Sequence, residues 1–74
     1  MKEIALIEIE DKKRSYEKLA EECGTKLKAD KNNRVHWYIY NNNEYNMEQE
    51  IEDLKEFYDE VIVVGKIKDK TSLW

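Results

Sequence analysis

The chain has 74 residues, so it has room for one hydrophobic core, and we expect a single small α/β domain over residues 1–74 with a short tail at 69–74. Its 17 carboxylates outnumber its 13 lysines and arginines, and the resulting net charge of −4 disfavours a basic nucleic-acid-binding surface. Cys23 is the only cysteine, which excludes an internal disulfide and favours a reducing compartment. Glu8 and Glu10 interrupt the apolar N-terminal run, so we expect neither a signal peptide nor a membrane span, and a cytoplasmic location.

The charge is unevenly distributed along the chain. Residues 24–43 sum to +3, whereas residues 44–60 sum to −7. We therefore expect one part of the surface to be much more negative than the net charge indicates. The abundance of Lys, Glu, Ile and Asn with few Ala is typical of AT-rich coding sequence, which favours a low-GC bacterium or its phage.

The first expected element is a strand over residues 2–10. Ile4 to Ile9 are apolar at both odd and even positions, apart from Glu8, which is typical of a central strand covered on both faces. A helix over residues 12–23 follows, with Asp11 as its N-cap and Gly24 as its C-cap.

A β-hairpin is expected next. Residues 25–29 alternate polar with small or apolar side chains, residues 30–33 form a turn signal, and residues 35–40 are rich in β-branched and aromatic side chains. The lysines of the first arm suit an edge strand, and the second arm suits the sheet interior.

The clearest helical pattern lies at residues 46–59. Asn46 and Gln49 resemble a capping box, and Met47, Ile51, Leu54 and Tyr58 form an apolar stripe in which we expect Leu54 to be fully buried. A β-branched strand over residues 60–67 ends the expected elements.

The order β-α-β-β-α-β predicts an α+β fold, a two-layer ferredoxin-like sandwich with a four-stranded antiparallel sheet and both helices on one face. If residues 25–29 are not a strand, the chain becomes a three-stranded β-α-β-α-β unit, which is the alternative.

The expected strand at residues 35–40 has two different faces. Val35, Trp37 and Ile39 form the more apolar one, which we assign to the core. The other face would then lie on the open side of the sheet, and it carries His36, Tyr38 and Tyr40. Three interpretations are open: a protein-binding or self-association surface, a platform on which RNA or DNA bases stack, or a shield under the tail that ends in Trp74.

Acidic residues recur every fourth position around the second helix. The set is Glu44, Glu48, Glu52, Glu56 and Glu60. Like charges at i and i+4 cost about 0.2–0.5 kcal/mol each in an isolated helix. Such a ridge suits contact with a basic partner, including a nucleic-acid-binding protein whose phosphate site it would mimic, or it serves solubility alone.

An acidic cluster and the single cysteine are the remaining candidates for chemistry. Glu8, Glu10 and Asp11 could bind Mg²⁺, as in a small metal-dependent nuclease, or could be a solvated strand end. Cys23 has no activating neighbour in the sequence, and no phosphate-binding glycine loop or His/Cys metal set is present, so we expect no cofactor and no catalytic residue.

Together these patterns predict a non-enzymatic protein-protein interaction module, such as a small acidic inhibitor, adaptor or regulatory subunit. Its partner would be another protein, in particular a basic one, or a second copy of the chain in a homodimer. Nucleic acid is the weaker candidate partner, and no membrane is expected.

Overall fold

The computed structural model describes residues 1–42 and 47–67. They form five elements in chain order, with bounds β1 Lys2–Glu10, α1 Glu17–Lys28, β2 Asn33–Asn41, α2 Met47–Phe57 and β3 Glu60–Val64. The strands make one sheet in the order β2-β1-β3, and both strand pairs are parallel.

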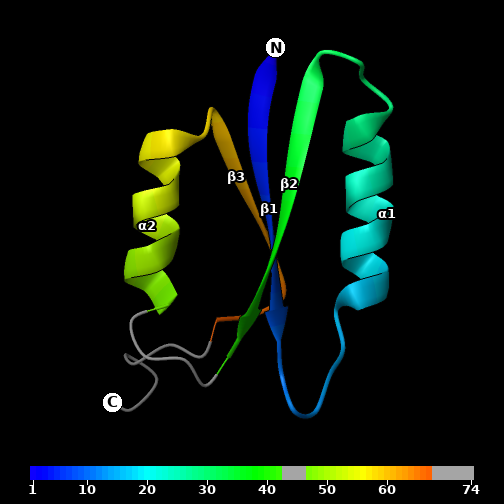
Figure 1. Ribbon diagram of the computed structural model, residues 1–74. Coiled ribbons are helices and arrows are strands. Elements are labelled where there is room, and N and C mark those ends of the chain that lie inside the picture. The colour runs from blue at the N-terminus through cyan, green and yellow to red at the C-terminus, as the bar shows by residue number, and fades with distance from the viewer. Residues whose placement is uncertain (43–46, 68–74) are drawn as a thin grey trace.

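The helices lie on opposite faces of this sheet (Figure 1). The first crossover runs from β1 to β2, and the second runs back past β1 to β3, so right-handed connections place α1 and α2 on different sides. The predicted four-stranded antiparallel sandwich with both helices on one face is therefore wrong. The three-stranded β-α-β-α-β alternative agrees with the structure.

The error arises at residues 25–29, which continue a helix instead of forming a hairpin arm. The Thr25 hydroxyl donates to the carbonyl of Glu21 at 2.8 Å, and the Ala29 amide donates to the carbonyl of Thr25 at 3.1 Å. Without a hairpin, each pair of successive strands is joined by a helix, and such crossovers produce parallel pairs.

Gly24 lies inside α1 and does not end it. A Cβ atom at Gly24 would lie 3.3 Å from Cδ2 of Leu6 on β1. The missing side chain therefore lets α1 approach the sheet closely, and the helix begins only at Glu17 because residues 11–14 form a tight turn instead. In that turn the Asp11 carboxylate accepts from the amide of Lys13 at 3.0 Å, so Asp11 is not the N-cap.

The central strand β1 supplies most of the core, as its pattern predicts. Six successive residues, Ile4 to Ile9, are buried. Ile7 and Ile9 pack with Met47 and Ile51 on the α2 side of the sheet. Leu6 lies on the opposite side, where it meets α1.

The apolar stripe of α2 is confirmed, but its centre is displaced by one turn. Met47 and Ile51 are buried, whereas Leu54 is only half-buried, so the expectation of a fully buried Leu54 is wrong. Leu54 lies near the end of a helix that stops at Phe57, and it packs at the border of the core cluster. Asn46, the other half of the expected capping box, lies outside the described residues.

Candidate functional site

Open parallel sheets commonly bind ligands at the carboxyl ends of their strands, at the point where the strand order reverses. Here that point lies between β1 and β3, just beyond Glu10 and Val64. Gly65 follows β3 with a φ of 111°, and a Cβ there would lie 3.0 Å from Cδ2 of Tyr16. Gly65 therefore packs closely against Tyr16 and Ile9 at this end of the sheet.

Asn42 joins the strand ends in the same region. Its backbone amide donates to the carbonyl of Glu10 at 2.8 Å, and its side-chain amide donates to the carbonyl of Lys66 at 3.2 Å. The same Nδ2 lies 3.5 Å from the carboxylate of Asp11. Asp11 therefore takes part in holding the strand ends together.

Glu8 is the one buried charged side chain among the described residues, with 1% of its surface exposed. Its burial, followed by the hydrogen bond and charge of Glu10, raises the pKa of the carboxyl group to about 7, while a hydrogen bond from the Trp37 side chain acts in the opposite direction. Oε1 of Glu8 has no hydrogen-bond partner. Protonation makes the Glu8 side chain neutral, which removes most of the desolvation cost of its burial and its repulsion from the Glu10 carboxylate.

The acidic cluster predicted at Glu8, Glu10 and Asp11 is not assembled as a metal site. In the part of the chain that the structure describes, no three His, Cys, Asp or Glu side chains come together to hold a metal ion. Glu8 and Glu10 share the α1 side of the sheet, whereas Asp11 belongs to the turn described above. The single cysteine, Cys23, is half-buried.

The aromatic face of β2 is covered by α2 and is not open as predicted. Tyr38 and Tyr40 are half-buried and pack against the core cluster under α2. Their rings stack at 6.3 Å, and the Tyr38 hydroxyl is hydrogen-bonded to the hydroxyl of Tyr58. This bond and burial raise the pKa of Tyr58 to about 12. The reason for the error is the third layer, because a helix on each face leaves neither face of the sheet fully open.

His36 belongs to the same face of β2 as Tyr38 and Tyr40, but it is exposed and lies beside charged side chains. Its Nε2 lies 2.9 Å from a carboxylate oxygen of Glu3, and Nη1 of Arg34 lies 3.6 Å from the other oxygen of that carboxylate. The His36 ring also meets the edge of the Tyr58 ring, with 5.4 Å between centroids. Arg34 and His36 of β2 thus share one carboxylate on β1.

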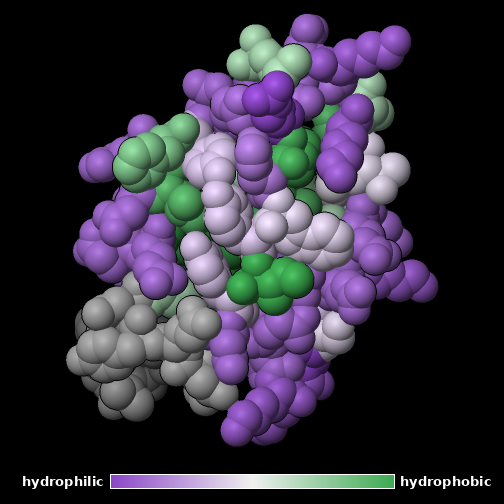
Figure 2. Space-filling model, in the orientation of Figure 1, coloured by the Kyte–Doolittle hydropathy of each residue, from purple (hydrophilic) through white to green (hydrophobic). Residues whose placement is uncertain are grey.

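The other face of β2 is the one that reaches solvent. Trp37, with 42% of its surface exposed, and Ile39, with 61%, were assigned to the core from their composition. They lie on the α1 side, where the helix covers β1 and Val35 but leaves these outer positions open. Figure 2 shows side chains of intermediate and high hydropathy down the middle of the molecule over β2, between the hydrophilic surfaces of the helices.

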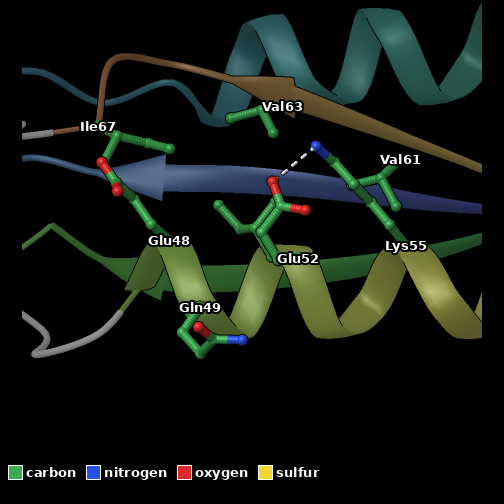
Figure 3. Close-up of a pocket in the computed structure, with 8 residues that line it drawn as sticks. Glu48, Gln49, Glu52, Lys55, Val61, Val63 and Ile67 are labelled. Carbon is green, nitrogen blue, oxygen red and sulfur yellow. Dashed lines mark hydrogen bonds and ion pairs between the residues drawn. The ribbon is translucent and has the colours of Figure 1, made fainter.

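A second open surface is a groove of about 450 Å³ between α2 and β3. Its apolar residues are Ile51, Val61, Val63 and Ile67. Its polar residues come from one side of α2, namely Glu48, Gln49, Glu52 and Lys55. Figure 3 shows Glu48 and Glu52 directed from the helix toward the strands, with Val63 facing them.

Part of the predicted acidic ridge therefore lies at this groove. Glu48 and Glu52 line it, and Lys55 donates to Glu52 at 3.0 Å. Glu48 forms no ion pair with any described residue. Glu56 is exposed near the end of α2 but does not line the groove, and Glu60 belongs to β3, where it pairs with Lys2 at 2.8 Å. Glu44 and Trp74 lie outside the described residues.

The apolar half of the groove was not predicted from the sequence. Val63 and Ile67 were counted as part of a β-branched strand with no assigned face. The available signal was the alternation along residues 60–64, which places Val61 and Val63 on the same face of the strand.

No described helix is long and apolar enough to cross a membrane. Comparisons of the chain with protein-family models, with curated proteins and with solved structures gave no match.

Proposed function

We propose that the protein is an interaction module that binds a basic, amphipathic segment of another protein in the groove between α2 and β3. The observation that supports this most strongly is the composition of the groove, in which apolar side chains of β3 face two carboxylates of α2. An occupant with apolar side chains on one face and Lys or Arg along its border would match both halves.

The charge around the groove favours a cationic occupant. Five of the eleven residues of α2 are acidic, and Lys55 is the only basic one. Lys55 already pairs with Glu52, so it does not oppose a second cation at Glu48. Electrostatic attraction of this kind chiefly accelerates association, while burial of apolar surface at Val63 and Ile67 slows dissociation.

The other two function classes have less support. The tyrosines that would stack nucleic-acid bases pack under α2, and Arg34 and His36 of β2 both contact Glu3. The three carboxylates that a nuclease would need are not together. Glu8 is buried in the sheet with Glu10 on the same side, whereas Asp11 lies in the turn after β1. The groove remains the surface where shape and charge agree.

The test uses a fluorescein-labelled amphipathic helical peptide made of Lys and Leu, and a control peptide with Glu in place of Lys. We expect fluorescence anisotropy to show binding of the Lys peptide at low salt, at least tenfold weaker binding by the Glu48→Gln/Glu52→Gln variant, and no binding of the Glu peptide. Glu21→Gln/Glu22→Gln is the matched control, because it removes two exposed carboxylates from α1.

The apolar half of the groove is tested separately. Val63→Ser should weaken binding of the Lys peptide even in high salt, where charge attraction is screened within a Debye length of about 3 Å at 1 M. Equal loss of affinity in the α1 control and the α2 variant would show that binding depends only on the net charge of the protein and not on the groove. That result would overturn the proposal. So would an absence of binding to the wild-type protein at low salt.

A further inference from the structure

β2 is an edge strand of the described sheet. The strand is nine residues long and pairs with β1 along its whole length, and no described strand pairs with its other side. Natural proteins commonly protect such edges with lysine, proline or a bulge. Residues 33–41 contain no lysine and no proline.

The hydrogen bonds at the ends of β2 identify the residues whose backbone groups face outward. The Lys2 amide donates to the carbonyl of Asn32, and the Asn42 amide donates to the carbonyl of Glu10. Even-numbered positions of β2 are therefore directed toward β1, and the alternation of a strand directs the odd-numbered positions away from it. The outward positions include Val35, Trp37 and Ile39, whose side chains lie on the α1 side, where Trp37 and Ile39 are exposed and Val35 is half-buried.

We propose that the β2 edge pairs with the β2 edge of a second copy of the chain, antiparallel and with Trp37 on the twofold axis, to form a continuous six-stranded sheet. A twofold axis requires a self-complementary surface. The sequence Asn-Arg-Val-His-Trp-Tyr-Ile-Tyr-Asn of β2 is close to symmetric about Trp37. Val35 then lies opposite Ile39 of the second copy, and Trp37 lies opposite Trp37.

The opposite face of the pair is also matched in this register. His36 lies opposite Tyr38 of the second copy, and Arg34 lies opposite Tyr40, which allows a cation-π contact. The outward-facing pairs Val35–Ile39 and Trp37–Trp37 each exchange two N–H···O bonds. A shift of two residues would place Val35 opposite Asn41, so the apolar match favours the register centred on Trp37.

Charge also favours self-association at this edge over other surfaces. The chain has a net charge of −4, but residues 31–43 contain no carboxylate, so the strand that would form the interface adds no negative charge of its own to the contact between two acidic copies. This edge lies across β1 from the groove between α2 and β3. The homodimer and the proposed binding of a basic segment are therefore independent, and either can be found without the other.

Sedimentation equilibrium tests the proposal with the full chain. We expect a dimer, and we expect Ile39→Lys to weaken it at least a hundredfold, because the lysine would lie opposite Val35 in the middle of the interface. Ile39→Val is the conservative control and should remain a dimer. Ile39 is well exposed, so circular dichroism should show that the lysine variant stays folded. A wild-type monomer at millimolar concentration, or an Ile39→Lys dimer, would overturn the proposal.

Disulfide trapping tests the register. In a Cys23→Ser background, an equimolar mixture of Val35→Cys and Ile39→Cys chains should form a disulfide-linked dimer, because opposite Cα atoms of such a pair lie about 5.5 Å apart. Either chain alone should cross-link at least tenfold more slowly, since equivalent positions lie four residues from their partners. Equal rates in the mixture and in the separate chains would contradict the register centred on Trp37.

Discussion

Gly24 of α1 lies directly over Leu6 of β1, and a Cβ at Gly24 would be 3.3 Å from the Leu6 Cδ2 atom. Alanine favours a helix over glycine by about 1 kcal/mol, but this contact is tighter than van der Waals distance and Leu6 is buried. We therefore expect Gly24→Ala to change the free energy of unfolding by less than about 1 kcal/mol. In a Leu6→Val background the same substitution should be more favourable by at least about 0.5 kcal/mol. Urea unfolding of the four proteins measures this coupling, and additive effects would show that the two residues do not limit the approach of α1.

Gly65, the other glycine of the chain, should behave differently. Its φ of 111° is a conformation that side chains rarely adopt, and a Cβ would lie 3.0 Å from Tyr16 and 3.1 Å from Ile9. We expect Gly65→Ala to cost roughly 2 kcal/mol or more. A thermal midpoint within the error of the wild type would show that this turn accepts another backbone conformation.

Glu8 should make the protein less stable as the pH rises. Its pKa is about 7 in the folded chain against 4.5 for an ordinary Glu, so the folded state binds the proton more tightly than the unfolded state. Its destabilising effect is absent below pH 4.5, grows between pH 4.5 and 7, and is complete above pH 7. The full loss of folding free energy is on the order of 3 kcal/mol, because each pKa unit corresponds to about 1.4 kcal/mol.

Glu8→Gln tests this dependence because glutamine resembles the protonated acid and stays neutral. We expect the variant to match the wild type near pH 4.5 and to exceed its stability by up to about 3 kcal/mol at pH 8. Glu22→Gln, at an exposed position of α1, should show no such trend. A stability difference between Glu8→Gln and wild type that stays constant from pH 4.5 to 8 would contradict the raised pKa.

The burial of α2 predicts unequal effects along its apolar stripe. Ile51 is buried in the core cluster and Leu54 is half-buried at its border. We expect Ile51→Ala to cost about 2–4 kcal/mol and Leu54→Ala to cost about half as much. Chemical unfolding of the two variants measures the ratio, and a larger loss at Leu54 would mean that α2 is rotated on the sheet.

The sequence predicted β1 best, because apolar side chains on both of its faces require cover on both sides. That requirement already conflicted with a two-layer fold, in which one face of the sheet stays open. Gly24 is central to this conflict, because a glycine at this position is typical of a helix end, whereas in the structure it is the position where α1 contacts Leu6. A glycine inside a helix and a glycine after one are alike in local sequence, and only the contact across the layers separates them.

The site was predicted only in part for the same reason. The carboxylates Glu48 and Glu52 followed from helical spacing, but the apolar side chains they face come from β3, whose neighbours depend on the strand order. Trp37 was assigned to the core because it is large and apolar, yet the outer position of β2 leaves it partly in solvent. Spacing within one element could be read from the sequence, whereas contacts between elements could not.

The most direct test of the groove is an NMR titration of the ¹⁵N-labelled protein with the Lys and Leu peptide. We expect the amide shifts that change with peptide to lie in α2 and β3, with the largest changes near Glu48, Glu52 and Val63, and to be absent in the Glu48→Gln/Glu52→Gln variant at the same peptide concentration. The β2 edge should change little, because it lies on the other side of β1. Changes centred on α1 or β2 at saturating peptide, with α2 and β3 unaffected, would contradict binding in the groove.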